Sequence, residues 1–357
     1  MLHVFLGTKA QYIKTAPVLH ELDRRGVAYR LIDSGQHAQL TRGLRTELGI
    51  RDPDVSLGGS RDVESIPQAI TWAGGVAARL ASRDRLRRDV FGGESGTCVL
   101  HGDTPTTLLS AAMAHRAGLD VAHLEAGLRS HSLAHPFPEE LIRLAVMRRA
   151  ELLFAPDAHA VRNLTEMRVR GRVIPVSANT ITESLRAALG GDLSPSSSGA
   201  VVVTVHRVEN LHRSRPLHDL MRVIPRIAKE HPVEFVTHGP TRQVLAKRGF
   251  ESQLVDAGVR LVPLLAHTSF VERLRDAPFV ITDGGSIQEE CALLGVPTLL
   301  WRARTEREDG LGDNVLLSNY DSRIVDEFIA QPQRWRRPSV SADARPSAEI
   351  VEALISG

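Results

Sequence analysis

Short apolar runs alternate with longer segments of helical periodicity along most of the chain, and polar or glycine-containing turns follow most of the apolar runs. Runs of this kind are typical of buried strands, and the periodicity between them is typical of amphipathic helices. The alternation predicts a doubly wound α/β fold with a parallel sheet. The strand-like runs of the first half are VFL (4–6), YRLIDSG (29–35), TCVLHGD (97–103), DVAHLEAG (120–127), ELLFAPD (151–157) and RVIPVSAN (172–179).

A linker divides this pattern into two halves. Gly, Ser and Pro crowd together in GGDLSPSSSG (190–199), and the alternation then starts again. We therefore expect an N-terminal domain over residues 1–178, a linker over 179–199, a C-terminal domain over 200–345, and a last helix over 346–357 that packs on the N-terminal domain. The fold class predicted is α/β, with two Rossmann-like doubly wound domains that face each other across a cleft. The strand-like runs of the second half are VVVTVH (201–206), VEFVTHG (233–239), VRLVPL (259–264), FVITDGG (279–285) and PTLLW (297–301).

The composition is that of an ordinary globular protein, and it argues against several partners. Hydrophobic residues make up 42% and charged residues 24% of the 357 residues, and the formal net charge is +2. The chain has no basic run that would follow a nucleic-acid backbone, no apolar run near the roughly 18 residues that span a membrane, and no secretory signal. Its two cysteines, Cys98 and Cys291, lie in opposite halves and provide no disulfide framework. We expect a cytoplasmic protein that binds neither nucleic acid nor membranes.

Ionisable residues stand directly after many of the strand-like runs. Ligands of doubly wound sheets bind beyond the carboxyl ends of the strands, so a binding site is expected there. A single His or Asp after a strand is most often a cap or a turn residue, but repetition at the same end of several strands is harder to explain in that way. The segments are GTKAQYIK (7–14), HGDTPTT (101–107), HLEAGLRS (123–130), VHRVEN (205–210), THGP (237–240) and DGGSIQEE (283–290).

Three acids are candidates for proton transfer. Asp103 also suits the N-cap of the helix that follows it, and Glu139 stands with Glu140 in an ordinary acidic first helical turn. Glu125 is harder to explain structurally, because the chain breaks at Gly127 before any helix needs an acid in its first turn. A carboxylate partly removed from water near other polar groups suits proton transfer.

Two lysines in the first predicted strand-to-helix turn stand out against the rest of the chain. Lys9 and Lys14 are two of only four lysines among 44 basic residues, and the chain uses arginine almost everywhere else. A compact ammonium is not interchangeable with a planar guanidinium, so a specific role is expected for this pair.

The second half contains a candidate phosphate site. The glycines of DGGSIQEE precede a predicted helix, whose N-terminal N–H groups and dipole favour an anion, and Glu290 is expected near a ribose hydroxyl. His206 and His238 each end a strand-like run. They lack the paired spacing of zinc ligands, so we expect them to contact phosphate or hydroxyl groups. We expect no metal and no cofactor.

These motifs, in this order, resemble the non-hydrolysing UDP-N-acetylglucosamine 2-epimerases, which have the two-domain fold of the B-type glycosyltransferases. The most specific part of the resemblance is HLEAGLRS followed shortly by PEELIR. The matching segments are GTKAQYIKTAPV (7–18), SGQHAQL (34–40), HGDTPTT, HLEAGLRS, PFPEELIR (136–143), TVHRVEN (204–210), DGGSIQEE and RTER (304–307).

The resemblance implies an elimination mechanism. The C2 proton is lost as UDP leaves C1, and the resulting 2-acetamidoglucal takes a proton on its opposite face before UDP returns. The implied catalytic residues are Asp103, Glu125, Glu139, Lys14 and His206. The implied substrate-binding residues are Lys9, Arg129, Arg143, His238, Phe270, Gly284, Gly285, Ser286, Glu290 and Arg307, and Gln36 and His37 match a loop that holds a second, allosteric UDP-sugar in some bacterial members. A homodimer is implied as well.

Three departures from the family pattern lie around the expected nucleotide or sugar. They are GTKAQ in place of GTRPE, DGGS in place of DSGG, and TERED in place of TERPE. Another nucleotide-sugar is therefore an alternative substrate, and a hydrolysing relative that releases UDP and free sugar is an alternative activity. A B-type glycosyltransferase and a non-catalytic nucleotide-sugar sensor are alternatives from other functional classes.

Overall fold

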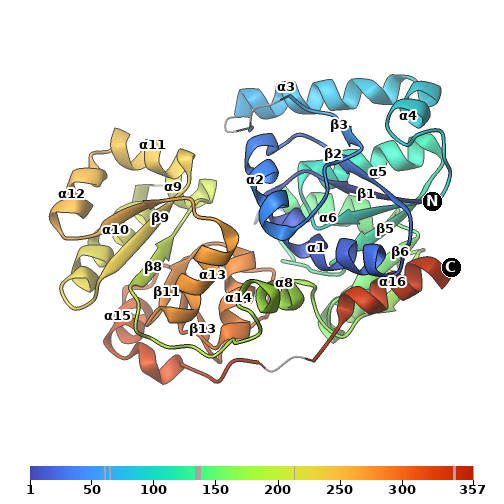
Figure 1. The fold of residues 1–357 in the computed structure, drawn as a ribbon. Coiled ribbons are helices and arrows are strands. Elements are labelled where there is room, and N and C mark those ends of the chain that lie inside the picture. The colour runs from blue at the N-terminus through green and yellow to red at the C-terminus, as the bar shows by residue number, and fades with distance from the viewer. Residues whose placement is uncertain (60–61, 64–65, 133–137, 213, 341–342, 357) are drawn as a thin grey trace. The chain divides into compact units, whose positions relative to one another are not determined.

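The computed structural model describes residues 1–357 except 60–61, 64–65, 133–137, 213, 341–342 and 357. The chain forms two compact units (Figure 1). One unit consists of residues 1–184 with 343–357, and the other consists of residues 185–342. Helix α8 (Ile181–Ala188) lies within the stretch expected as a linker, and the boundary between the units falls inside this helix. No helix in the described part of the chain is long and apolar enough to cross a membrane.

The first unit contains a sheet with the strand order β3-β2-β1-β4-β5-β6-β7. All neighbouring strands in it are parallel, as the alternating pattern predicts. The strands are β1 (Leu2–Leu6), β2 (Tyr29–Asp33), β3 (Val55–Ser56), β4 (Thr97–His101), β5 (Asp120–Leu124), β6 (Leu152–Ala155) and β7 (Arg172–Pro175). The other elements of this unit are α1 (Lys9–Arg24), α2 (Ala38–Leu48), α3 (Ile66–Ala77), η1 (Ala78–Ala81), α4 (Arg83–Asp89), α5 (Pro105–Ala117), α6 (Glu139–Met147), α7 (Ala158–Glu166) and α16 (Pro346–Ser356).

Alternating strand side chains divide the interior of this unit between the two faces of the sheet. Phe5, Leu100 and Leu153 belong to a buried cluster with apolar residues of α3 to α7. The C-terminal helix α16 lies beside α1 (Figure 1), where Arg25 and Glu352 form an ion pair at 2.5 Å. The last segment of the chain therefore returns to the unit that contains the N-terminus.

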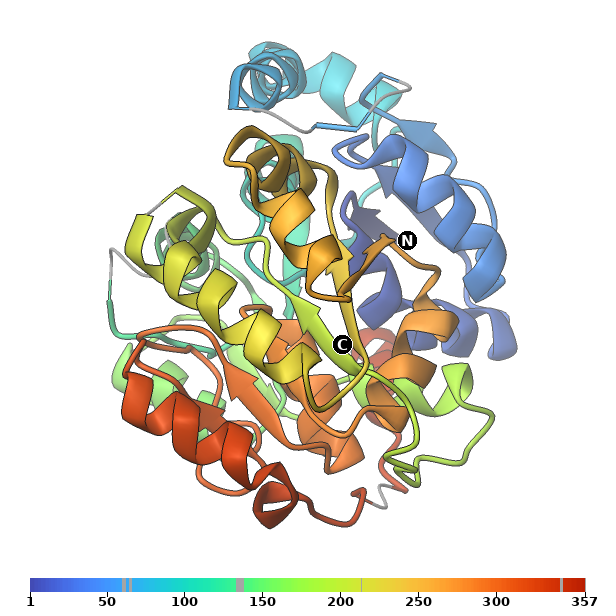
Figure 2. The ribbon, with the colours of Figure 1, turned by 90° about the vertical axis from the view of Figure 1, so that its left-hand side faces the viewer.

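The second unit repeats the architecture with a parallel sheet in the order β10-β9-β8-β11-β12-β13. Val203 and Phe235 point to one face and pack with α10, α12 and α15, whereas Val202 and Val236 point to the other and pack with α8, α13 and α14. Figure 2 looks onto the side of this unit that carries α10, in yellow. The elements are β8 (Val201–Thr204), α9 (Val208–His212), α10 (Ser214–Ala228), β9 (Val233–Thr237), α11 (Gly239–Lys247), α12 (Phe250–Asp256), β10 (Arg260–Pro263), α13 (His267–Asp276), β11 (Val280–Thr282), α14 (Gly285–Leu294), β12 (Thr298–Leu300), β13 (Val315–Leu317), α15 (Ser322–Ala330) and η2 (Pro332–Trp335).

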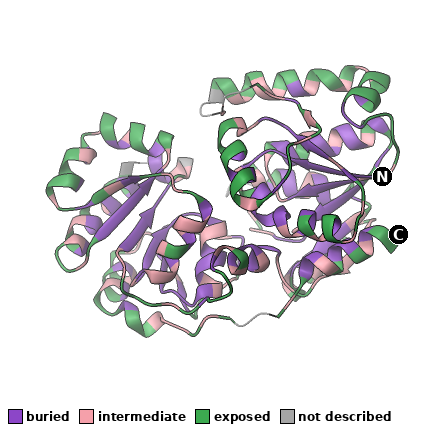
Figure 3. Ribbon diagram, viewed as in Figure 1, coloured by how far each residue is buried: buried purple, intermediate pink, exposed green. Residues whose placement is uncertain are grey.

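Most strands are buried and the helices expose their outer faces, as Figure 3 shows for both units. In the first sheet the order of the strands reverses between β1 and β4, and in the second sheet it reverses between β8 and β11. Ligands of doubly wound sheets bind at the carboxyl ends of the strands near such a reversal. The turns after these four strands are therefore where each unit is expected to place functional side chains.

Candidate active site

The turn after β1 is joined to the turn after β4 by Gln11. Thr8 caps α1, and the Gln11 carboxamide oxygen accepts from the N–H groups of Gly7 (3.0 Å) and Thr8 (3.2 Å). The same carboxamide donates to the carbonyl of His101 (2.8 Å) and to Thr107 Oγ1 (3.0 Å). Gln11 is only 2% exposed and uses both its acceptor and its donor. A carboxylate at this position could not donate to the His101 carbonyl.

Glu125 follows β5 in a strained backbone conformation. Its φ of +61° lies in the left-handed region, where a residue with a side chain is held at a cost of roughly 1–3 kcal/mol. Two contacts hold the turn. The Ala126 N–H donates to the carbonyl of Phe154 at 2.9 Å, and Gly127 lies so close to α7 that a Cβ there would meet the Ala160 oxygen at 2.4 Å. The surrounding structure therefore determines where the Glu125 side chain starts.

The Glu125 carboxylate has partners from three separate segments. Lys14 Nζ of α1 lies 2.5 Å from Oε1, and Asn179 Nδ2 donates to the same oxygen at 2.6 Å. His101 Nε2, at the end of β4, lies 3.3 Å from Oε2. The Lys14 and Glu125 side chains are only 3% and 7% exposed. A carboxylate this deeply buried is tolerated because an ammonium and an amide replace the water it has lost.

Asp103 lies in the turn after β4 and forms an ion pair with Arg143 of α6. Arg143 also lies 3.5 Å from Glu140 of its own helix. The Asp103 side chain is 23% exposed, in contrast to Glu125, so the two neighbouring strand-end acids have different environments.

Glu140 connects the start of α6 to the segment after Glu125. It is fully buried, and it accepts from Arg129 Nε at 2.5 Å and from the Ser130 N–H at 3.0 Å. Burial raises the pKa of Glu140, but the hydrogen bonds from Arg129 and Ser130 outweigh it, so the pKa lies below its ordinary value. Glu139 is the first residue of α6 and is half-buried.

His123 of β5 supports the turn that carries Asp103. Its ring is 1% exposed, and Nε2 lies 2.7 Å from the carbonyl oxygen of Gly102. Burial lowers the pKa of His123 to about 4, so the ring is neutral at neutral pH. A neutral ring can donate its Nε2–H to this carbonyl only in one tautomer, which the contact selects.

The loop of Gln36 and His37 lies next to the same turns. Thr106 Oγ1 of α5 donates to Gln36 Oε1 at 2.7 Å, and the His37 N–H donates to the Gly7 carbonyl at 3.0 Å. Burial lowers the pKa of His37. The loop predicted to hold a second ligand is thus attached to the turn after β1 and to the start of α5.

In the second unit, Asp283 organises the turn after β8. It is fully buried and accepts from the backbone N–H groups of His206 (3.1 Å) and Arg207 (3.0 Å) and from Asn210 Nδ2 (2.9 Å). His206 Nδ1 lies 3.3 Å from Asp283 Oδ1, and the His238 ring lies 4.9 Å from the His206 ring. The His206 side chain is 37% exposed. Loss of water around the ring lowers the pKa of His206, and this effect outweighs the nearby Asp283 carboxylate, which raises the pKa.

Helix α14 begins at Gly285, separated from β11 by two residues, and its N-cap residue is Gly284, which has no side chain to cap the helix. A Cβ on Gly284 would lie 3.3 Å from His206 Cε1, and one on Gly285 would lie 3.0 Å from Glu306 Oε1 and 3.2 Å from Arg307 Nε. Arg307 pairs with buried Glu289 at 2.9 Å, and Glu306 pairs with Arg302 at 3.0 Å. The positive end of the helix dipole therefore lies beside an imidazole and a guanidinium, which suits an anion, and the nearby Glu306 carboxylate is already paired with an arginine.

The other predicted residues fall on these same elements. Lys9 is the first residue of α1 and is half-buried. Phe270 lies in the first turn of α13, packed against the apolar cluster on that face of the second sheet. On α14, Ser286 is half-buried and Glu290 is 4% exposed.

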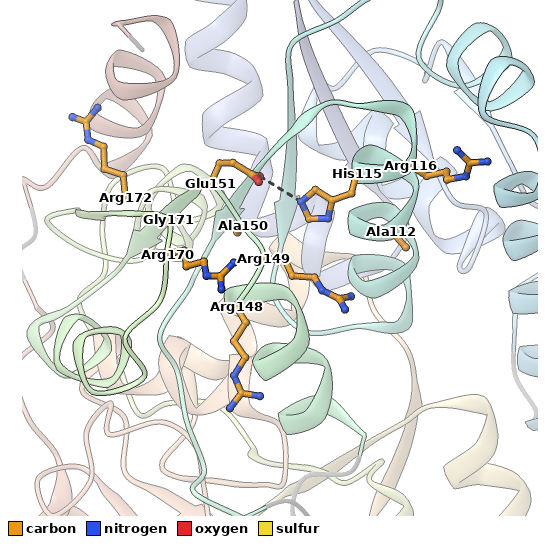
Figure 4. Close-up of a pocket in the computed structure, with 10 residues that line it drawn as sticks. All are labelled: Ala112, His115, Arg116, Arg148, Arg149, Ala150, Glu151, Arg170, Gly171 and Arg172. Carbon is orange, nitrogen blue, oxygen red and sulfur yellow. Dashed lines mark hydrogen bonds and ion pairs between the residues drawn. The ribbon is translucent and has the colours of Figure 1, made fainter.

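A separate cavity of about 760 Å³ lies at the opposite edge of the first sheet, where β6 and β7 begin. Half of its lining residues are arginines, but Figure 4 shows their guanidinium groups pointing in different directions. Solvated surface charges are arranged in this way, whereas an anion site requires them to converge. The lining residues are Ala112, His115, Arg116, Arg148, Arg149, Ala150, Glu151, Arg170, Gly171 and Arg172, and none of the predicted site residues is among them.

The sequence model of the UDP-N-acetylglucosamine 2-epimerases matches residues 20–344. The chain belongs to the UDP-N-acetylglucosamine 2-epimerase family. This confirms the resemblance seen in the motifs. The UDP-N-acetylglucosamine 2-epimerase of Bacillus subtilis (strain 168) is 28% identical, over 98% of this chain and 93% of that protein. The enzyme of the same name from Methanocaldococcus jannaschii is 24% identical, over 100% of this chain and 99% of that protein.

Solved structures of family members confirm the α/β fold class. The UDP-GlcNAc 2-epimerase of Neisseria meningitidis bound to UDP-GlcNAc has a TM-score of 0.84 at 23% identity, with all of both chains covered. The Methanocaldococcus jannaschii UDP-GlcNAc 2-epimerase in complex with UDP-GlcNAc and UDP has a TM-score of 0.83 at 23% identity, with 100% of this chain and 99% of that chain covered.

Several polar residues at these sites were not predicted from the sequence, among them Asp283, His101 and Asn179. Asp283 and His101 stand in the segments DGGSIQEE and HGDTPTT, which were singled out for other residues, and their position at strand ends was the signal that could have found them. Asn179 ends the strand-like run RVIPVSAN, so it carried the same signal. Its contact with the Glu125 carboxylate joins residues more than fifty positions apart, and only the tertiary structure reveals it.

Proposed function

We propose that this chain is a non-hydrolysing 2-epimerase that interconverts UDP-GlcNAc and its C2 epimer, UDP-ManNAc. Membership of the family supports the epimerase activity. The observation that carries the proposal is the pair of strand-end acids. Glu125 is buried against Lys14, and Asp103 is partly exposed beside Arg143, on neighbouring strands. Carboxyl groups in different environments suit a reaction that removes a proton from one face of a carbon and returns one to the other.

In the proposed reaction, one carboxylate of the set Asp103, Glu125 and Glu139 accepts the C2 proton while the bond from C1 to the UDP oxygen breaks. The electron pair of the C2–H bond becomes the C1=C2 double bond of 2-acetamidoglucal. A second carboxyl group of the set then delivers a proton to the opposite face of C2, and the UDP oxygen bonds to C1 again. Atoms balance without consumption of water, so the nucleotide-sugar is recovered intact.

The departing UDP is the main charge to be stabilised. In the second unit, the uncapped start of α14 at Gly284 and Gly285 suits the pyrophosphate, with His206 and Arg307 beside it. Asp283 faces His206 Nδ1 and so leaves Nε2 to contact a phosphate oxygen. Within the first unit, Lys14 places a positive charge next to Glu125, one of the three candidate acids.

One departure from the family pattern has an explanation within the chain. Gln11 replaces the glutamate of GTRPE, and its carboxamide is fully engaged with the chain itself, including the carbonyl of His101. We attribute this change to packing of the turns after β1 and β4, and not to recognition of a different sugar.

Proton NMR in deuterated water tests the proposal. UDP-GlcNAc incubated with the protein should gain deuterium at C2 and form UDP-ManNAc without release of UDP. Glu125→Gln should slow the exchange at least about a hundredfold, as expected for loss of an acid–base group, while UDP binding persists. Absence of C2 label in the wild-type reaction would exclude the proposed function, and accumulation of UDP with free ManNAc would show a hydrolysing enzyme instead. Parallel incubations with dTDP- and GDP-sugars define the nucleotide.

A further inference from the structure

We propose that Asn179 is a positioning residue for the acid–base carboxylate of Glu125. This inference rests on the proposed function, because it assigns a role in preparing the same carboxylate. Asn179 Nδ2 donates to Glu125 Oε1 at 2.6 Å, and Lys14 Nζ lies 2.5 Å from that oxygen. Two donors from different segments thus meet one carboxylate oxygen, while Oε2 faces His101 Nε2 at 3.3 Å.

The carboxamide of Asn179 is held in one orientation by the helix that follows it. Its Oδ1 accepts from the Ile181 N–H at 3.3 Å, at the start of α8, and the Thr182 N–H donates to the Asn179 carbonyl at 3.1 Å. With the oxygen turned toward the helix start, the NH₂ group must face Glu125. The helix start thereby decides which end of the amide reaches the carboxylate.

A donor at this position has two effects on Glu125. It favours the ionised form, which is the form that accepts a proton, because an N–H donor stabilises negative charge on the oxygen. It also restricts rotation of the carboxylate plane, because Lys14 alone is a point charge that can be approached from many directions. The strained turn at Glu125 fixes where the side chain begins, and Asn179 with Lys14 fixes where it ends.

A purely structural role for Asn179 can be distinguished from a positioning role, because the two ends of its amide make separate contacts. The oxygen accepts from the first backbone N–H of α8, and the nitrogen contacts Glu125. Aspartate keeps an oxygen for the helix N–H and is a good capping residue. It removes the donor and places a second carboxylate against the first. Asn179→Asp therefore preserves the cap and reverses the interaction with Glu125.

The experiment is a ¹³C NMR titration of the Glu125 carboxyl group in the full-length protein, with the signal assigned by its loss in Glu125→Gln. Titratable groups around this carboxylate include Lys14 and His101, which lie against it, and His123, which interacts with it electrostatically; all three stay unchanged in the variants. Asn179→Asp should raise the titration midpoint of Glu125 by about one pH unit or more, because two adjacent carboxylates cannot both ionise easily. Asn179→Ala should raise it by less.

Asn314→Ala is the matched control. Asn314 is 2% exposed in the second unit, and its Nδ2 donates to the backbone carbonyls of Cys291 (2.8 Å) and Val296 (2.9 Å). This variant also loses a buried amide donor, but that donor serves carbonyls of the second unit, so the Glu125 midpoint should stay unchanged. An unchanged midpoint in Asn179→Asp, or an equal rise in Asn314→Ala, would overturn the positioning role.

The rate of C2 deuterium exchange gives an independent second reading. In Asn179→Asp the acidic limb of the kcat/KM profile should move to higher pH together with the NMR midpoint, and the loss should shrink as the pH rises. The titration requires no turnover. If the wild-type protein shows no C2 exchange, the proposed function fails, but the titration still decides the role of Asn179. If exchange occurs and the titration midpoint of Glu125 is the same in Asn179→Asp as in the wild type, only the inference on Asn179 fails.

Discussion

At the scale of single residues, His123 shows how a buried support of the site makes stability depend on pH. Burial lowers its pKa from 6.5 to about 4, so between these pH values the unfolded chain binds a proton that the folded chain does not. Stability should therefore fall as the pH drops through this window, by about 3 kcal/mol from this residue at pH 4. Buried His3, whose pKa is also lowered to about 4, acts in the same direction.

His123→Gln isolates the contribution of this residue, because the glutamine amide can still donate to the Gly102 carbonyl but does not titrate. Urea unfolding between pH 4 and pH 7 should show a flatter pH dependence in the variant than in the wild type; His3, His37 and His206, whose pKa values are also lowered, contribute to the slope that remains. The same slope in both proteins would mean that the His123 ring takes up its proton in the folded state at an ordinary pH.

At the scale of elements, the turn that joins β5 to the segment after it depends on one glycine. Gly127 has φ +97°, and a Cβ there would meet the Ala160 oxygen of α7 at 2.4 Å. Gly127→Ala should therefore displace α7 or the turn, lower the melting temperature clearly, and move Glu125 away from Lys14. Gly190→Ala is the control, because Gly190 also has a positive φ (+61°) but a Cβ there would meet nothing within 4 Å. Equal losses of stability in the two variants would show that the contact with α7 is unimportant.

At the scale of the whole molecule, the chain ends on the unit in which it begins. Helix α16 packs on α1 through buried residues such as Ile350 and Val351, and α1 carries both Gln11 and Lys14. Removal of residues 346–357 should increase hydrogen exchange in α1 and slow C2 exchange, while β8 to β12 stay protected. Glu352→Arg, which breaks only the surface pair with Arg25, should change stability by less than about 1 kcal/mol. Unchanged exchange in α1 after the truncation would show that α16 is dispensable.

The sequence by itself determined the class of fold, most strand ends and the family. Parallel strands buried on both faces are apolar runs, and their carboxyl ends meet at one edge, so local pattern alone predicted that Asp103, Glu125, His206 and Gly284 follow strands, where ligand sites are expected. Motifs such as HLEAGLRS then indicated the family, because their residues are adjacent in the chain.

Only the tertiary structure decided which side chains meet. The contact of Asn179 with Glu125, the link from Gln11 to the turn after β4, and the Asp103–Arg143 pair all join residues far apart in sequence. Periodicity reports whether a residue faces the interior, but it carries no information on which distant polar partner replaces the water lost there. That partner is set by the packing of whole elements. In this chain the packing decides that the Glu125 carboxylate is buried against Lys14, whereas the Asp103 carboxylate is left partly exposed.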